Sequence, residues 1–139
     1  MAKNWKVFTL NEERQNSLKR ISIDNLNVEF EINRVFYMFD VPESENRGRH
    51  AHHSGWQVLI ALQGSFEISL YDGHISDDFI IKDLNKGLLI SPMVWRELRS
   101  FSSDAICLVL NTEKYDEKNT IRSFEEFKHL VRNPNNRKS

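Results

Sequence analysis

Two histidines, His50 and His52, are the residues of this sequence best suited to chemistry, because an imidazole can act as base and as acid near neutral pH. On a β-strand, a spacing of two residues places both rings on one face, whereas His53 points to the other face. Two imidazoles on an inward face are costly unless polar groups surround them. The pair therefore indicates either a polar pocket or two structural histidines at a strand end.

The residues that follow this pair fit a known spacing. Four residues separate His52 from Gln57, and six residues separate Gln57 from Gly64. This spacing resembles the first sequence signature of the cupins, in which a metal-binding glutamate usually stands at the position of Gln57. A neutral amide is a poor ligand for a divalent cation, but it still exchanges hydrogen bonds in a polar pocket. The pattern favours a pocket in which side chains carry out acid–base chemistry.

A metal site is the alternative for the same residues, and it needs at least a third good ligand. The second cupin signature normally supplies a histidine shortly after a proline. The matching stretch here, Pro92-Met-Val-Trp-Arg-Glu, contains no histidine. Glu97 can complete a set of two histidines and one carboxylate, so a metal-dependent cupin stays an open alternative.

Tyr37 lies in an aromatic stretch that has the length of a strand. Strand alternation places Tyr37 and Phe39 on the face opposite to Phe36 and Met38. If the face of Tyr37 is the pocket, its hydroxyl can donate a hydrogen bond or relay a proton. Otherwise Tyr37 is an ordinary aromatic side chain of a β-core.

Several arginines lie near the predicted strand ends and the histidine segment. Guanidinium groups suit phosphate oxygens because they bind them in a bidentate manner. One such arginine alone indicates only a solvated face, but several around one mouth favour an anionic, phosphorylated ligand. These arginines are Arg34, Arg47, Arg49, Arg96 and Arg99.

Short apolar segments separated by turn residues predict an all-β domain. Phe66, Ile68 and Leu70 alternate with more polar residues, as in a half-buried strand. Asp72-Gly73 then supplies a hairpin turn. Many short strands without interleaved helices favour a cupin-type jelly roll, an antiparallel β-sandwich or barrel. The expected strands are residues 28–32, 34–39, 56–62, 66–71, 79–84, 88–91 and 105–111.

The two ends of the chain carry weaker signals. Ser123 and Glu126 form a possible capping box, and the residues that follow predict a short C-terminal helix with an apolar face. That face consists of Phe124, Phe127, Leu130 and Val131. Residues 133–139 have nothing to bury, which predicts a flexible tail. Near the N-terminus, Trp5 and its neighbours predict an edge strand that can pair with another subunit.

The composition of the 139 residues excludes several classes of protein. The length predicts a single cupin domain over residues 1–132. The formal net charge of −1 gives no basic field for nucleic acid or an anionic membrane. The longest apolar run, residues 105–110, is too short to span a membrane, and no signal peptide is evident. Cys107 lies in that run as a small buried hydrophobe, and we expect a cytoplasmic protein.

A longer series of motifs resembles the sugar-nucleotide 3,4-ketoisomerases, which are WxcM-like cupins of deoxysugar biosynthesis. The resemblance covers residues 28 to 130. The motifs are Arg47-Gly-x-His50-Ala-His52, Arg34-Val-Phe-Tyr37-x-Phe-Asp40, Pro92-x-Val-Trp95, Phe101-Ser-Ser-Asp104 and Tyr115-Asp-Glu followed by Ile121-Arg122. This ordered series is far more specific than a lone His-x-His.

The resemblance implies a homodimeric jelly roll that needs no metal or other cofactor. It implies a dTDP-linked 4-keto-6-deoxyglucose as substrate and its 3-keto isomer as product. Amination and acylation of that product lead to a sugar of lipopolysaccharide, including O-antigen, or of another surface glycan. The family's catalytic histidines fall on His50 and His52, its active-site tyrosine on Tyr37, and its arginine before the glycine on Arg47. We expect the substrate-binding residues to be Arg47, Arg49, Gln57, Arg96, Glu97 and Arg34.

The implied reaction suits these side chains. Moving a ketone from C4 to C3 requires removal of the C3 proton and return of a proton to C4, with an enediol between. A histidine is competent for both steps. We expect His52 to be the principal base, with His50 and Tyr37 shuttling protons or stabilising the enediol.

Two departures from the family bear on the substrate. Related sequences commonly carry histidines at the positions of Arg96 and Arg99, so this chain can differ in its proton relay, product configuration at C4, nucleotide or sugar. The alternatives are a dTDP-4-keto-6-deoxysugar epimerase, the metal-dependent cupin described above, and a non-catalytic protein that binds a sugar nucleotide. Retention of His50, His52 and Tyr37 together favours an enzyme.

Overall fold

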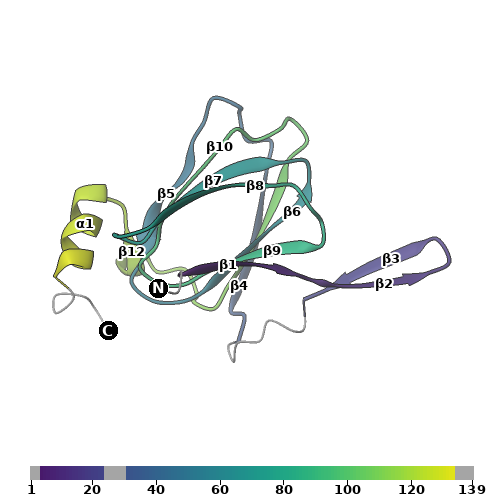
Figure 1. Ribbon diagram of the computed structural model, residues 1–139, viewed down its shortest axis with the longest axis horizontal. Helices are drawn as coiled ribbons and strands as arrows, with labels where there is room; N and C mark the ends of the chain where they lie inside the picture. The colour runs from purple at the N-terminus through teal and green to yellow at the C-terminus, as the bar shows by residue number, and fades with distance from the viewer. Residues whose placement is uncertain (1–3, 24–30, 134–139) are drawn as a thin grey trace.

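Two five-stranded antiparallel sheets face each other and enclose the core (Figure 1). The computed structural model describes residues 4–23 and 31–133. The first sheet has the order β1-β9-β6-β11-β4, with β1 Trp5–Thr9, β9 Lys86–Ile90, β6 Gln57–Gln63, β11 Ile106–Asn111 and β4 Arg34–Phe39. The second has the order β12-β5-β10-β7-β8, with β12 Thr120–Ile121, β5 Arg47–His52, β10 Trp95–Arg99, β7 Phe66–Tyr71 and β8 Ser76–Ile81.

Three smaller elements complete the described part of the chain. Strands β2 Asn11–Gln15 and β3 Leu18–Ser22 form a separate two-stranded sheet, and a 3-10 turn, η1, covers Glu117–Asn119. Helix α1 covers Phe124–Arg132. Together with the two main sheets, these elements confirm the predicted all-β sandwich with one short C-terminal helix.

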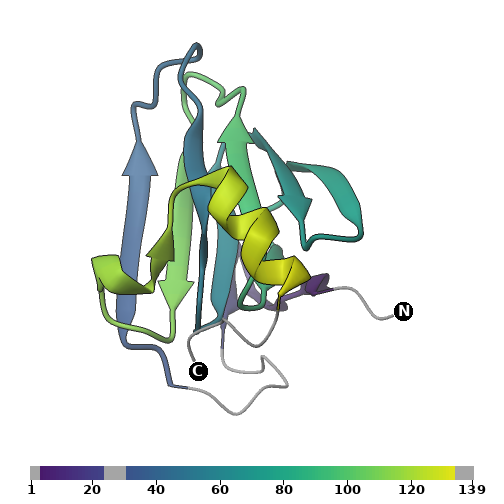
Figure 2. The same ribbon diagram turned by 90° about the vertical axis from the view of Figure 1, so that its left-hand side faces the viewer.

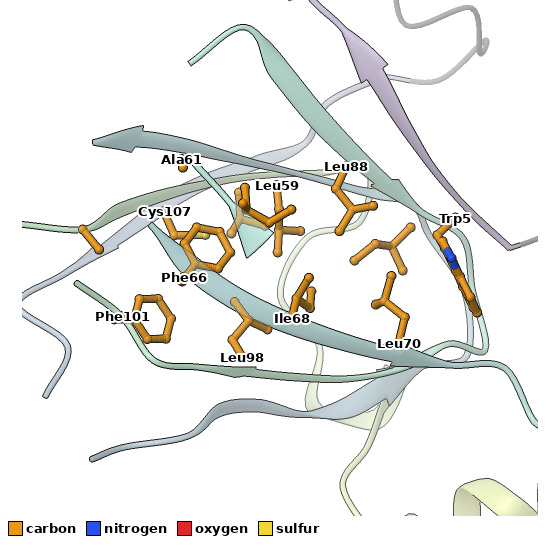
Figure 3. Packing of buried hydrophobic residues seen from close by; sticks show 14 of the residues in the cluster. Trp5, Leu59, Ala61, Phe66, Ile68, Leu70, Leu88, Leu98, Phe101 and Cys107 are labelled. Carbon is orange, nitrogen blue, oxygen red and sulfur yellow. The ribbon is translucent and has the colours of Figure 1, made fainter. Parts of the chain in front are cut away.

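Alternate residues of facing strands fill the space between the two main sheets (Figure 3). The half-buried pattern predicted for residues 66–71 is confirmed, because Phe66, Ile68 and Leu70 are fully buried. The ring of Phe66 stacks on Phe101 with centroids 5.3 Å apart. Each such buried side chain contributes about 1.5–3 kcal/mol relative to its exposed state. This core gives the strands a fixed register, and that register determines which side chains enter the space between the sheets.

Helix α1 covers the outer face of the second sheet (Figure 2). The predicted cap is confirmed at its first turn, where the backbone N–H of Glu126 donates to the hydroxyl of Ser123 over 3.1 Å. Phe127 is completely buried against Trp95, with ring centroids 5.8 Å apart. The helix therefore shields from water a sheet face that would otherwise expose Trp95.

Most predicted strands are confirmed, and the misses have physical causes. The bounds of 34–39 and 66–71 agree with β4 and β7, and those of 56–62, 88–91 and 105–111 agree within two residues. The strand expected at 79–84 lies three residues earlier, as β8. Strand β10 was not predicted, because the charged Arg96 occupies an inward position and breaks the apolar alternation. Of the strand expected at 28–32, residues 28–30 lie outside the described residues, and residues 31 and 32 are not in a strand.

The N-terminal residues form more structure than the sequence indicated. Strand β1 lies at the edge of the first sheet, as predicted, and pairs with β9. Strands β2 and β3 form a hairpin arm that stands away from the two main sheets (Figure 1). All five residues of β2 are exposed. The flexible tail predicted at 133–139 lies, from residue 134 onward, outside the described residues. Within the described part of the chain, no helix is long and apolar enough to cross a membrane.

The contact between α1 and the sheet leads to a stability prediction. Replacement of Phe127 by alanine should lower the free energy of unfolding by about 3–5 kcal/mol, because it leaves a cavity beside Trp95. Phe124 is 40 % exposed in the same helix, so Phe124→Ala should cost clearly less. Urea denaturation of both variants measures the difference. Equal losses would contradict this description of the helix contact.

Candidate active site

A cavity of about 200 Å³ lies between the two sheets and opens toward residues 113–122. Its walls come from β5 and β10 of one sheet and from β4, β6 and β11 of the other. Leu59, Leu98 and Val109 line it and also belong to the hydrophobic core. The cavity is therefore continuous with the packed interior, and its shape is supported by the core on which it rests.

His50 and His52 both line this cavity from β5. Their Nε2 atoms are 3.1 Å apart, which is a hydrogen-bond distance, and their rings are nearly perpendicular at 84°. The N–H of one imidazole therefore donates a hydrogen bond to the other ring. The predicted placement of both rings on one strand face is confirmed, whereas His53 does not line the cavity.

Both imidazoles are held in the neutral form. Burial lowers the pKa of His50 and of His52, and the neighbouring Arg96 guanidinium lowers both further. Arg122 acts in the same direction on both rings, and His50 also lowers the pKa of His52. For His50, the Glu117 carboxylate and a hydrogen bond with the backbone of Gly48 oppose this by raising its pKa. A neutral imidazole with a free lone pair is the form that can accept a proton from a substrate carbon.

Arg96 and Gln57 form the polar floor of the cavity. Arg96 is 2 % exposed and lies opposite His50 in the β10–β5 pairing. Its Nη1 donates to the Gln57 side-chain oxygen, and its Nη2 donates to the carbonyl of Val94 over 3.2 Å. Burial lowers the pKa of Arg96 to about 9, so the guanidinium stays charged at neutral pH. The amide that replaces the usual metal-binding glutamate therefore holds a cation.

A β-bulge brings Arg47 to the same cavity. Arg96 pairs with His50 but Leu98 pairs with Arg47, so β5 has one residue more than β10 between these pairs. Gly48 lies in this extra stretch with φ +82°, and a Cβ there would be 2.7 Å from Leu98 Cδ1. Glycine is suited to this backbone conformation. The bulge reverses the alternation, so that Arg47 lines the cavity together with His50.

The mouth of the cavity contains polar residues to which the sequence analysis assigned no role. The Tyr115 hydroxyl donates to Glu117 Oε2 over 2.7 Å, and Arg122 binds both carboxylate oxygens of Glu117 over 2.5 and 3.0 Å. The Arg34 guanidinium lies 5.2 Å from the centroid of the Tyr115 ring. Tyr115 and Arg122 belong to the quoted family motifs. No strand or helix pattern in the sequence indicated that this segment folds back over the histidines.

Three predicted site residues lie outside the cavity in the described part of the chain. The side chain of Tyr37 is 62 % exposed on the outer face of the first sheet, while Phe36 and Met38 line the cavity. The predicted alternation in β4 is therefore confirmed, but the opposite face is the inner one. Arg49 and Glu97 are absent from the cavity wall and form an ion pair with each other over 3.3 Å.

The residues present do not fit a cupin metal site. Glu97 is paired with Arg49 away from the cavity, so it does not join His50 and His52. Gln57 stands at the position of the acidic ligand, and the buried Arg96 cation beside it would repel a divalent ion. Among residues 4–23 and 31–133, no group of three or more His, Cys, Asp and Glu side chains could hold a metal ion.

Comparison with known proteins identifies the family. The family model described as FdtA, WxcM-like, C-terminal, matches residues 1–132. The chain belongs to this WxcM-like family. A curated relative, the TDP-4-oxo-6-deoxy-alpha-D-glucose-3,4-oxoisomerase of Aneurinibacillus thermoaerophilus, is 41% identical over 108 residues, which are 78% of this chain and 78% of the relative.

Solved structures of this WxcM-like family share the fold. A 3,4-ketoisomerase from Helicobacter canadensis is 37% identical with a TM-score of 0.89, and the match covers 95% of this chain and 100% of that one. The ketoisomerase QdtA of Thermoanaerobacterium thermosaccharolyticum, crystallised as a histidine-to-asparagine variant with TDP-4-keto-6-deoxyglucose, is 30% identical with a TM-score of 0.88. That match covers 95% of this chain and 96% of QdtA. The predicted cupin-type jelly roll is confirmed by this likeness.

The neutral histidine pair predicts a pH dependence of stability. The pKa values of His50 and His52 are lowered in the folded state, so below pH 6.5 the unfolded chain binds more protons than the folded one. Stability should therefore fall as the pH falls from 6.5 to 5, with a slope of at most about 1.4 kcal/mol per pH unit for each histidine. Urea denaturation across this window measures the slope.

Replacing both histidines by asparagine should flatten this dependence. Replacing His74, which is exposed outside the cavity, should leave the pH dependence of stability unchanged. A slope that survives loss of both cavity histidines would contradict the description of the pair as buried and neutral.

Proposed function

We propose that this protein is a sugar-nucleotide 3,4-ketoisomerase that converts TDP-4-keto-6-deoxyglucose into its 3-keto isomer. The contact between the Nε2 atoms of His50 and His52, inside a cavity with a cationic floor, carries the proposal. Two neutral imidazoles that share a proton can take a proton from one carbon and return it to the next. The names of the relatives, which act on or bind this class of sugar nucleotide, support the same reaction.

The reaction moves protons without any change in overall composition. A neutral histidine removes the C3 proton, the electron pair forms the C3–C4 double bond, and O4 takes the negative charge. The proton of the C3 hydroxyl then passes to O4, the C3 carbonyl forms, and the imidazolium returns a proton to C4. General acid–base help of this kind contributes about 10²–10⁴-fold to the rate.

The hydrogen bonds of the pair favour His52 as the principal base. The backbone hydrogen bond at Gly48 raises the pKa of His50, so an N–H of this ring donates a hydrogen bond there. A neutral imidazole has one N–H, so the Nε2 of His50 then accepts from the Nε2 of His52. His52 is left with a lone pair on its other ring nitrogen. In this arrangement His50 positions and supports His52, and the proton can be passed between the two rings.

Arginines at the cavity provide for the diphosphate of the substrate. Arg34, Arg47 and Arg122 all line the cavity, and each bears a guanidinium suited to phosphate oxygens. Arg47 is paired with Glu45 over 2.6 Å, and Arg122 with Glu117. Both pairs are exposed, so exchange of a carboxylate for a phosphate costs little. We therefore place the nucleotide at the mouth and the sugar on the histidines.

The activity is tested by proton NMR of TDP-4-keto-6-deoxyglucose incubated with metal-stripped protein in deuterated buffer. We expect the 3-keto isomer to appear with deuterium at C4, and the coupling at C4 gives the product configuration. His52→Asn should lower turnover by about 10²–10⁴-fold because the base is lost. The exposed His74→Asn should leave turnover unchanged.

Other outcomes of this experiment lead to different conclusions. Unchanged turnover in folded His52→Asn protein, verified by circular dichroism, would contradict the assignment of the base. Binding of the nucleotide sugar without isotope exchange in the wild-type protein would indicate a binding role in place of catalysis. Turnover that requires an added divalent metal would contradict the metal-independent mechanism.

The proposal includes a homodimer, which the described surface supports. The outer face of the first sheet exposes a row of apolar side chains, formed by Val35, Tyr37, Phe39 and Leu62, which are between 42 % and 62 % exposed. The hairpin arm of β2 and β3 stands away from the two main sheets, and a two-stranded hairpin alone is only marginally stable in water. A second copy of this chain would cover both features. Tyr37 would then contribute to the dimer and not to catalysis.

Sedimentation measurements test this assembly. We expect a dimer for the wild-type protein at micromolar concentrations and a monomer for the Tyr37→Glu, Phe39→Glu double variant, because buried carboxylates oppose association. Ile80→Glu is the matched control, since Ile80 is 64 % exposed on β8 of the other sheet. A monomeric wild-type protein, or a double variant that stays dimeric, would overturn the proposed interface.

We place this activity in the biosynthesis of deoxyaminosugars in the cytoplasm. The 3-keto product has a carbonyl that a transaminase can convert to an amine, and acylation can follow. Such sugars are components of lipopolysaccharide and other surface glycans. The buried free thiol of Cys107 is compatible with a reducing compartment.

A further inference from the structure

Arg96 is a buried cation without a neutralising partner. Its guanidinium donates to two neutral groups, the Gln57 amide oxygen and the Val94 carbonyl, and its Nε is buried without any hydrogen bond. None of the ion pairs among the described residues involves Arg96, although Arg49, Arg99 and Arg122 each pair with a carboxylate. The cavity floor therefore has a full positive charge.

This arrangement is costly for the folded protein. Removing a charged group from water is unfavourable, and proteins usually offset this with an opposite charge and with hydrogen bonds. Here neutral oxygens hold the guanidinium in place but leave its charge. A glutamate at position 57 would neutralise it with little change in shape, since the amide and the acid have nearly the same size. A cost of this kind, at a cavity beside two imidazoles, is expected where the charge has a function.

The charge lies where an anion forms during the reaction. Arg96 is directly opposite His50 in the strand pairing, and both line the cavity with His52 and Gln57. When the C3 proton leaves, the negative charge appears on O4 of the sugar. It moves to O3 as the hydroxyl proton passes to O4, and it disappears when C4 is protonated. An electrostatic interaction with a charge that exists only during the reaction lowers the barrier without tightening binding of the ground state.

We propose that Arg96 is a catalytic residue that stabilises the enediolate oxygen, and that Gln57 is a positioning residue that holds Arg96 without neutralising it. This inference rests on the proposed ketoisomerase function. It assigns to a side chain the electrophilic role that a metal ion has in a metal-dependent site. After the larger effect of burial, the same cation lowers the pKa of both histidines, so one charge helps to keep the base neutral and stabilises the product of its action.

The first test is the variant Gln57→Glu, which places a carboxylate beside Arg96. We expect kcat to fall about 10²-fold, as when one oxyanion donor is lost, with little change in KM. The acid limb of the kcat/KM profile should move to higher pH, because neutralising Arg96 raises the pKa of both histidines. The matched control is Gln63→Glu, the same chemical change on the same strand at an exposed position.

A pair of substitutions at Arg96 tests the charge separately from the shape of the floor. Arg96→Gln removes the cation and should reproduce both the loss of kcat and the pH shift of Gln57→Glu. Arg96→Lys retains the cation and should retain the pH profile. These two variants keep the inference testable if Gln57→Glu does not fold, which circular dichroism will show.

A readout independent of turnover is the NMR titration of the two imidazoles in each variant. Their pKa values should rise in Gln57→Glu and in Arg96→Gln, and should stay in place in Gln63→Glu. A wild-type protein without isomerase activity would contradict the proposed function. An active wild-type protein whose kcat and pH profile are unchanged in folded Gln57→Glu would overturn the role of Arg96 alone.

Discussion

The hydrogen bond between Arg96 and Gln57 is the interaction on which the site depends. It joins β10 of one sheet to β6 of the other, across the space between the two layers. At this point the interior changes from a packed apolar core to a polar cavity, and a buried guanidinium needs fixed acceptors to remain there. The core residues Leu59 and Leu98 follow at alternate positions on the same two strands and keep these acceptors in place. The stability of the sandwich therefore supports a local arrangement that is unfavourable by itself.

The charge of Arg96 determines how the histidine pair can act. Two adjacent neutral imidazoles in a buried site are joined by one N–H hydrogen bond, and a nearby cation opposes the addition of a further proton. Before the reaction both histidines are therefore neutral, and one of them becomes charged only when it takes the proton whose departure leaves the substrate as an anion. This coupling links proton removal to the appearance of negative charge. It also explains why a neutral glutamine serves better at position 57 than the glutamate of metal-binding cupins.

The surfaces outside the cavity have different tasks. Helix α1 covers the outer face of the second sheet, so Trp95 is buried by residues of its own chain. The outer face of the first sheet is covered only in part: Val58 and Ile60 are buried there in a cluster against which Ile21 and Ile23 pack. Toward β4 the same face exposes Tyr37 and Phe39, and this is the surface we assign to a second copy. The side chains to which we assign catalysis belong to the inner faces of both sheets.

The sequence by itself determined the elements and the chemistry of the pair. The spacing of two residues in a strand fixes His50 and His52 on one face, and the position of Gln57 argues against a metal ligand. Alternation, turn residues and the helix cap are local properties of the chain, so most strands and α1 were predictable. Strand β10 was not predicted because the sequence does not distinguish the buried Arg96 from an exposed arginine.

Only the tertiary structure decided which faces are inside. Both faces of β4 are aromatic, so a period of two could not distinguish the face of Tyr37 from that of Phe36. Arg47 reaches the cavity through a bulge, which depends on the number of residues in the partner strand as well as in its own. Tyr115 and Arg122 line the cavity because the chain turns back toward it after β11, and no local sequence pattern specifies that turn. These features depend on contacts between segments far apart in the sequence, and such contacts exist only once the sheets have packed.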